Sequence, residues 1–208
     1  YGGAGADTIH GLIGDDYLHG GAGNDTLLGG VHTDFIYGEG DNDILDGEGG
    51  IDFLFGGSGN DTYVMSSMED TITELINGGV DVVVAYGSIT LADNVEDIEL
   101  RGADAISATG NSGANVLNGT TNANSNALFG LGGDDWYYLS AGDTAVEAAD
   151  GGNDTVVVDF SIVLVDYIEV LILAGGAEIT GTGNASSNTL YGNGAGNVLD
   201  GAGGADLL

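Results

Sequence analysis

Residues 2–64 read GGAGADTIH, GLIGDDYLH, GGAGNDTLL, GGVHTDFIY, GEGDNDILD, GEGGIDFLF and GGSGNDTYV, which are seven nonapeptides in one unbroken frame. Each unit has Asp at its sixth position and a large apolar residue at its eighth. A fixed period of this kind predicts a stack of like units, in which each unit buries its apolar residue against its neighbours. The aspartates are Asp7, Asp16, Asp25, Asp34, Asp43, Asp52 and Asp61, and the apolar residues are Ile9, Leu18, Leu27, Ile36, Leu45, Leu54 and Tyr63.

Glycines open every unit, and the units that begin at Gly2, Gly20 and Gly56 read GGxGxD. Glycine allows the positive φ of a sharp turn and lets carbonyl oxygens converge without a Cβ in the way. A hard divalent cation such as Ca²⁺ takes about six to eight oxygens at ~2.3–2.6 Å, which the carboxylates and carbonyls of two stacked turns can supply. The residues after each Asp are expected to form a short strand. Two units then complete one coil, so residues eighteen apart stack.

On these residues the chain resembles the RTX family of secreted calcium-binding repeat proteins, whose nonapeptides form a parallel β-roll. The resemblance is strong over residues 2–64. It is weaker over residues 110–138 and 183–208, which contain GNSGANVLN, GLGGDDWYY, GNASSNTLY, GNGAGNVLD and GAGGADLL. The resemblance implies several Ca²⁺ ions in the turns, export by one-step (type I) secretion, folding on meeting extracellular calcium, and a location outside the cell or on its surface.

The composition is consistent with a cation-binding chain. The formal charge is −32 and Arg101 is the single basic residue apart from histidine. A solenoid with a rise of about 4.8 Å per coil would carry a linear charge density comparable to that of duplex DNA, which excludes nucleic acid as a partner. The chain has no Cys and no long apolar run, so neither a disulfide framework nor a transmembrane segment is expected. Without a recognisable signal peptide or secretion tail, the secretion signal is expected elsewhere in a longer protein.

A second, longer period of 73 residues covers the rest of the chain. β-branched residues with period-two patterning indicate strands throughout. We therefore expect an all-β fold: a right-handed parallel β-roll over residues 1–64, followed by two copies of a longer solenoid module over residues 65–138 and 139–208. The period is carried by three pairs, Asp81 and Asp154, Glu96 and Glu169, and Asn111 and Asn184.

Turns on the same edge of the roll should stack their aspartates in two columns. The second column is expected to bind calcium less well, because His32 replaces a fourth-position glycine there and Leu12 and Glu48 replace second-position ones. Asp41 makes one such replacement in the first column. The alternative is that these aspartates only form turns. The first column is Asp7, Asp25, Asp43 and Asp61, and the second is Asp16, Asp34 and Asp52.

The later repeats offer fewer carboxylates. Asn replaces the sixth-position Asp in most of them, so these turns are expected to need calcium less. Four aspartates remain candidate ligands, two at sixth positions and two at the ends of Gly-Gly-x-Asp turns. They are Asp135 and Asp206, and Asp81 and Asp154.

The eighteen-residue register predicts an aromatic ladder on one outer face of the roll, with His19 among its members. Large exposed apolar patches usually mark contacts. We expect this face to pack laterally on another copy of the chain; stacking on extracellular polysaccharide and coverage by loops of the longer modules are the alternatives. The aromatic residues are Tyr1, Tyr17, Phe35, Tyr37, Phe53 and Phe55.

The sequence does not favour an enzyme. His10, His19 and His32 occupy positions that do not stack, and no Cys can serve as a nucleophile or ligand. The many GxG patterns lack the helix and the Lys that phosphate-binding loops require. No pair of carboxylates stands out as a general acid and base.

The two ends of the chain keep the nonapeptide frame if they are joined. Leu208 holds an eighth position and Tyr1 the ninth. This favours a slice of a tandem array, with end-to-end stacking of protomers as the alternative. The expected function is that of a calcium-binding structural module of an exported protein, which folds and assembles on binding Ca²⁺. The alternatives are an accessory domain of a secreted toxin or hydrolase, and an adhesive or glycan-binding module.

Overall fold

The computed structural model describes all residues from 1 to 208, and every regular element is a β-strand. Strands pair in parallel within two compact units, Tyr1–Arg101 and Gly102–Leu208. No membrane-crossing helix is present, since the chain has no helix at all. The expected all-β, parallel solenoid is confirmed. The division of the sequence into a nonapeptide segment, residues 1–64, and two longer modules, residues 65–138 and 139–208, stays a prediction.

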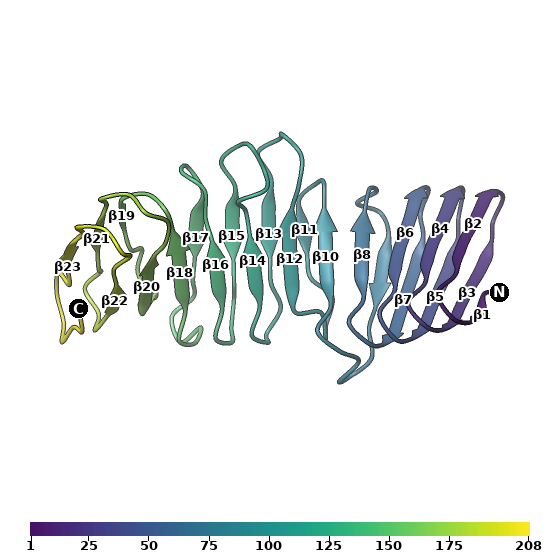
Figure 1. The fold of residues 1–208 in the computed structure, drawn as a ribbon, viewed down its shortest axis with the longest axis horizontal. Coiled ribbons are helices and arrows are strands. Elements are labelled where there is room, and N and C mark those ends of the chain that lie inside the picture. Colours follow the sequence, from purple (N-terminus) through teal and green to yellow (C-terminus); the bar gives the residue numbers. More distant parts are fainter. The chain divides into compact units, whose positions relative to one another are not determined.

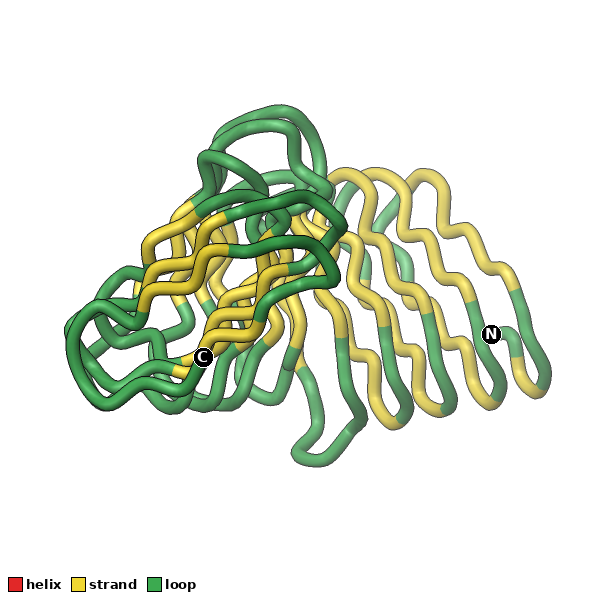
Figure 2. Tube along the Cα trace, turned by 60° about the vertical axis from the view of Figure 1, so that its left-hand side comes forward, coloured by secondary structure: helices red, strands yellow, loops and turns green.

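The first unit winds between two sheets, so that consecutive strands alternate between them (Figures 1 and 2). One sheet contains β1 (Gly3–Ala4), β3 (Tyr17–Ala22), β5 (Phe35–Gly40), β7 (Phe53–Ser58) and β9 (Thr71–Thr73). The other contains β2 (Thr8–Ile13), β4 (Thr26–Val31), β6 (Ile44–Gly49), β8 (Thr62–Met65), β10 (Val82–Ala85) and β12 (Asp97–Leu100). The short strand β11 (Ile89–Thr90) follows β10.

The strand register confirms the eighteen-residue coil over the nonapeptides. Thr26 pairs with Ile44, and Ile44 pairs with Thr62. Beyond β8 the coil length changes, because Thr62 pairs with Val82, twenty residues on, and Val82 pairs with Asp97, fifteen residues on. The solenoid therefore continues past the nonapeptides, with coils whose turns differ in length.

The second unit has the same alternating construction with shorter strands (Figure 1). Its long sheet contains β14 (Val116–Asn118), β16 (Trp136–Tyr138), β18 (Thr155–Val158), β20 (Val170–Leu173) and β22 (Thr189–Tyr191). The facing strands are β13 (Ser107–Thr109), β15 (Ala127–Phe129) and β17 (Thr144–Val146), then β19 (Ile162–Val163), β21 (Thr180–Thr182) and β23 (Val198–Asp200).

The core is a column of eighth-position side chains between the sheets. Side chains alternate across a strand, so the middle residue of each short strand points inward while its neighbours point outward. Burial of one such apolar side chain stabilises the fold by about 1.5–3 kcal/mol. Ile9, in the first coil, is only partly buried. The buried members are Leu18, Leu27, Ile36, Leu45, Leu54 and Tyr63.

The residues that replace glycine in the turns adopt left-handed backbone conformations, as the sequence predicts. The φ angles are 78° at Leu12, 92° at His32, 70° at Asp41 and 60° at Glu48. Glu39 in the first column is a further case, with φ of 81°. A left-handed conformation costs roughly 1–2 kcal/mol for a residue with a Cβ. Both columns therefore contain strained turns, and the strain is not confined to the second.

Candidate metal centres

The first aspartate column is joined by hydrogen bonds from each coil to the next. The backbone N–H of Asp7 donates to Oδ1 of Asp25 at 2.7 Å, and that of Asp25 donates to Oδ1 of Asp43 at 2.7 Å. The N–H of Asp43 donates to Oδ1 of Asp61 at 2.8 Å, and that of Asp61 to Oδ1 of Asp81 at 2.7 Å. The structure thus stacks the four aspartates expected for this column and adds Asp81 to its end.

The second column follows the same rule on the other edge. The N–H of Asp16 donates to Oδ1 of Asp34 at 2.8 Å, and the N–H of Asp34 donates to Oδ1 of Asp52 at 2.8 Å. Asp52 N–H then donates to Oδ1 of Asp70 at 3.0 Å. Asp70 was not among the predicted ligands, although its position eighteen residues after Asp52 places it in this column.

The second oxygen of each column carboxylate, Oδ2, is buried and has no hydrogen-bond partner. An anionic oxygen in this environment is costly unless a cation or a proton compensates it. Arg101 is the single Lys or Arg side chain, and it forms an ion pair with Glu99 at 2.7 Å. The aspartates with such an atom are Asp7, Asp16, Asp25, Asp34, Asp43, Asp52, Asp61, Asp70, Asp81, Asp135 and Asp154.

The first-position glycines leave room for these oxygens. An ideal Cβ on Gly29 would lie 2.5 Å from Oδ2 of Asp34 and 2.9 Å from the carbonyl oxygen of Gly47. On Gly20 it would collide with Oδ2 of Asp25. A carboxylate oxygen and a carbonyl oxygen from the next coil therefore converge beside a glycine. This oxygen-only donor set fits a hard cation such as Ca²⁺.

Burial raises the pKa of the carboxyls of Asp43, Asp52 and Asp61, which lie deep in the two columns. Desolvation is the largest cause, and neighbouring carboxylates add to it, while a backbone hydrogen bond acts in the opposite direction. The pKa of Asp43 rises to about 6, that of Asp52 to about 6 and that of Asp61 to about 7. Anionic columns are therefore unfavourable at neutral pH without a compensating cation.

Comparison with known families agrees with this geometry. The family profile of the RTX calcium-binding nonapeptide repeat matches residues 1–31, 28–63 and 180–208, in four copies. These segments are RTX calcium-binding repeats. Residues 64–179 lie outside the matches, and no curated protein gives a significant match to the chain.

In the second unit, Asp135 and Asp154 reproduce the RTX column. Asn115 N–H donates to Oδ1 of Asp135 at 2.7 Å, and Asp135 N–H donates to Oδ1 of Asp154 at 2.8 Å. Asn188 N–H donates to Oδ1 of Asp206 at 2.9 Å, although Asp206 is only partly buried.

Two asparagine side chains of the second unit satisfy their amide groups through hydrogen bonds, whereas Nδ2 of Asn197 is buried without a partner. Nδ2 of Asn184 donates to the carbonyl of Val165 at 2.7 Å, and Nδ2 of Asn188 donates to that of Ile168 at 2.9 Å. An amide thus provides the donor that a carboxylate lacks. That these turns need calcium less stays a prediction.

The 73-residue period corresponds to a repeated hydrogen bond. Asp81 N–H donates to Oε2 of Glu96 at 2.8 Å, and Asp154 N–H donates to Oε2 of Glu169 at 2.9 Å. The Asp column of the RTX repeat therefore ends on a glutamate in each module. The 73-residue spacing of Glu96 and Glu169 marked them as equivalent positions, but it did not by itself give them a role.

The aromatic ladder is present on the outer face of the β3-β5-β7 sheet. Two stacks run across the strands with nearly parallel rings. In one, the Tyr17 and Phe35 ring centroids are 4.8 Å apart, as are those of Phe35 and Phe53. In the other, Tyr1, His19, Tyr37 and Phe55 follow one another at 4.5, 4.7 and 4.6 Å.

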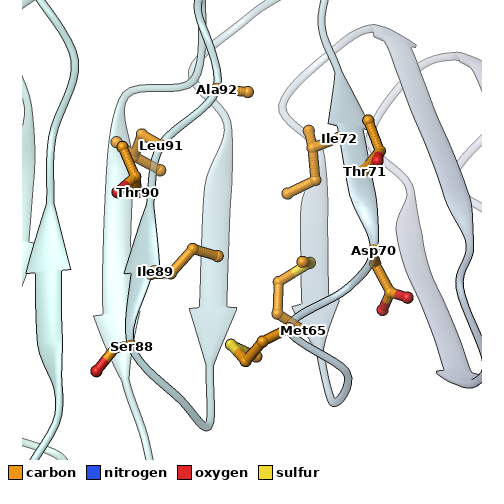
Figure 3. A pocket seen from close by; sticks show the side chains of 10 residues that line it. Met65, Asp70, Thr71, Ile72, Ser88, Ile89, Thr90, Leu91 and Ala92 are labelled. Carbon is orange, nitrogen blue, oxygen red and sulfur yellow. The ribbon is translucent and has the colours of Figure 1, made fainter.

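An open cavity of about 290 Å³ lies in the first unit beside strands β9 and β11. Figure 3 shows Ile72, Ile89 and Met65 turned toward the space, with Asp70 beside it. The lining is mostly aliphatic and offers one carboxylate. This cavity contains no cluster of groups that could perform chemistry or hold a cation.

Proposed function

We propose that the chain is a calcium-dependent structural module of an exported protein, which works outside the cell or on its surface and is not itself an enzyme. The observation that carries the proposal is the row of buried Oδ2 atoms without partners, in a chain of formal charge −32. The columns of RTX aspartates can be anionic and buried together only if cations accompany them.

The two carboxylate oxygens of each column Asp have different roles in the turn. Oδ1 of each Asp accepts the backbone N–H of the Asp in the preceding coil, and Oδ2 remains available beside a glycine and a carbonyl. The eighth-position side chains then become buried as the coils stack. When bound, Ca²⁺ supplies the positive charge that offsets the carboxylates and links adjacent turns.

Several sites must act together to hold the fold. Extracellular calcium modules bind with dissociation constants of about 10⁻⁴–10⁻³ M. At about 10 mM free calcium, a site of about 1 mM stabilises the folded chain by only about 1.4 kcal/mol. A long column of weak sites therefore suits a chain that stays expanded where calcium is scarce and folds where it is abundant.

Self-association is the second part of the proposal. The stacked aromatic face is flat and partly exposed, with Tyr17 at 64% exposure, so it suits lateral packing against another copy. End-to-end stacking of coils is the other route. The same stacked rings also favour one alternative function, adhesion to extracellular polysaccharide through ring stacking on sugars.

A calcium titration followed by far-UV circular dichroism, with light scattering on the same samples, tests the proposal. We expect a coil-to-β transition near millimolar calcium and a growth in mass. Asp25→Asn with Asp43→Asn should raise the calcium midpoint, whereas Asp93→Asn, at an exposed position, should not. A chain that is fully β-structured in chelator would overturn calcium-dependent folding, and a transition at constant mass would overturn assembly.

A further inference from the structure

Two clusters of three carboxylates lie where the chain leaves the regular coils. In the first, one oxygen each of Asp61, Glu74 and Asp81 lie within 4.8 Å of one another. These residues are only 1%, 8% and 0% exposed, respectively. Glu74 belongs to no nonapeptide: it lies in the segment that follows β9 and folds back over the end of the Asp column.

Glu74 is held in place by three donors. The Tyr63 hydroxyl donates to Oε1, which also accepts the N–H of Gly57 at 3.2 Å, while Oε2 accepts the N–H of Leu75 at 2.7 Å. Tyr63 is itself completely buried, and its oxygen accepts the N–H of Gly56 at 2.8 Å. The Glu74 carboxylate is therefore fixed by its surroundings.

The two aspartates of this cluster each keep an oxygen without a partner. Oδ1 of Asp61 and of Asp81 accepts a backbone N–H, but Oδ2 of both is buried and unpaired. A Cβ on Gly56 would collide with both Oδ2 of Asp61 and Oε1 of Glu74, so these two oxygens face one another over that glycine. Two anionic oxygens in this position repel each other unless a cation lies beside them.

Further neutral oxygens surround the other end of Glu74. An ideal Cβ on Gly78 would lie 2.7 Å from Oε2 of Glu74, 2.8 Å from the carbonyl oxygen of Gly57 and 3.2 Å from that of Leu75. The site thus combines carboxylates and carbonyls with no nitrogen or sulfur ligand. This is the donor set of a hard divalent cation.

The second unit repeats the arrangement 73 to 74 residues later. One oxygen each of Asp135, Glu147 and Asp154 lie within 4.8 Å of one another. The Tyr137 hydroxyl donates to Oε1 of Glu147, and Ala148 N–H donates to Oε2 at 3.0 Å. Oδ2 of Asp135 and of Asp154 is again buried without a partner.

Glycine again makes room for the carboxylates. A Cβ on Gly130 would collide with Oδ2 of Asp135 and Oε1 of Glu147, as one on Gly56 would in the first cluster. The same tyrosine, glutamate, two aspartates and glycine recur in a separate unit. This recurrence indicates a binding site rather than a chance cluster of acidic residues.

We propose that each cluster is a divalent-cation site that binds Ca²⁺. In each site a glutamate from outside the nonapeptides links a long turn to an RTX column through the bound ion. Tyr63 and Tyr137 are positioning residues that orient the glutamates. The inference rests on the proposed function in taking calcium as the cation, but it concerns glutamates that the repeat itself does not contain.

Proton sharing is the competing explanation for a buried carboxylate cluster. Desolvation, followed by the charges of Glu147 and other acids, raises the pKa of Asp135 to about 7 and that of Asp154 to about 6. A proton held at neutral pH would leave these groups without affinity for a metal. The experiment must therefore report occupancy by a metal ion directly.

Terbium luminescence provides that report for the second cluster. The chain has one tryptophan, Trp136, next to Asp135 in sequence, so emission of Tb³⁺ excited through tryptophan selects this site. With the full chain, we expect sensitised emission that Ca²⁺ competes away. Glu147→Gln should weaken Tb³⁺ binding about tenfold or more, whereas Glu74→Gln, in the first cluster, should leave the tryptophan-sensitised signal unchanged.

Counting ions tests both clusters together. Equilibrium dialysis with radioactive calcium should show one fewer bound ion for Glu74→Gln, one fewer for Glu147→Gln and two fewer for the double variant, while Glu69→Gln, an exposed control, should bind as many as the parent. Unchanged counts together with unchanged terbium emission would overturn the inference. If Glu147→Gln fails to regain β structure in calcium, Glu147→Asp replaces it, because the shorter acid retains the charge and should still weaken binding.

The two proposals fail in different ways. A calcium-induced coil-to-β transition without a Glu147-dependent terbium signal would leave the proposed function standing and refute the cluster sites. A Glu147-dependent signal in a chain that is already β-structured in chelator would do the reverse.

Discussion

The backbone N–H of Asp25 donates a 2.7 Å hydrogen bond to Oδ1 of Asp43 in the next coil, and this leaves Oδ2 of Asp43 buried without a partner. The same contact orders the stack and creates the electrostatic problem. Each added coil gains a hydrogen bond and a buried core residue, but it also brings another carboxylate next to the previous one. Stability should therefore depend on whatever neutralises the column.

The metal-free chain should become more stable as the pH falls. Burial raises the pKa of Asp43 to about 6 and that of Asp61 to about 7, from a usual value of 3.8. At pH values between the usual pKa and the raised pKa, the folded chain binds more protons than the unfolded chain. The free energy of unfolding therefore decreases as pH rises from about 4 to about 7. Far-UV circular dichroism of the chain in chelator should show more β structure at pH 5 than at pH 8. More β structure at pH 8 than at pH 5 would contradict the assignment of raised pKa values.

Gly29→Ala should destabilise the calcium-loaded fold. The new Cβ would lie 2.5 Å from Oδ2 of Asp34 and 2.9 Å from the carbonyl of Gly47, and overpacking of this kind typically costs about 1–3 kcal/mol. Gly176→Ala is the matched control, because a Cβ there meets no atom within 4 Å. Urea unfolding at saturating calcium measures both, and equal midpoints for the two variants would argue against crowding at the turn.

Ile36→Ala and Ile9→Ala compare the same residue at the same repeat position. Ile36 is completely buried, so its truncation should lower the free energy of unfolding by about 2–5 kcal/mol. Ile9 is only partly buried and its truncation should cost clearly less. The measurement is chemical denaturation at fixed calcium. Equal losses would mean that the first coil is as well packed in solution as the interior ones.

Phe35→Ala with Phe53→Ala should reduce self-association without shifting the calcium midpoint of folding. The rings stack on the outer face at 4.8 Å and do not contribute to the core. Thr26→Ala with Thr62→Ala, on the other sheet, is the control pair. Light scattering in calcium measures association. If the aromatic variant assembles normally but is no longer retained on a polysaccharide column, this result would contradict assembly through the aromatic face and support the adhesive alternative.

The aspartate columns could be predicted because a strict period fixes geometry. When every unit has nine residues, any two positions eighteen apart must be neighbours, so Asp25 had to stack on Asp43 and Phe35 on Phe53. The arithmetic fails where turns vary in length. Thr62 pairs with Val82 after twenty residues, and no period in the sequence placed Glu74 beside Asp61.

The sequence by itself determined the family of the repeats, the parallel β-solenoid, the inward column of apolar residues and the two rows of carboxylates. These follow from a local rule repeated in register, which needs no knowledge of distant contacts. Only the tertiary structure decided how each row continues past the nonapeptides, with Asp70 on one edge and the Asp61, Glu74 and Asp81 cluster on the other. The physical reason is that a side chain on an irregular turn is placed by the coil against which that turn folds, and not by its number in the repeat.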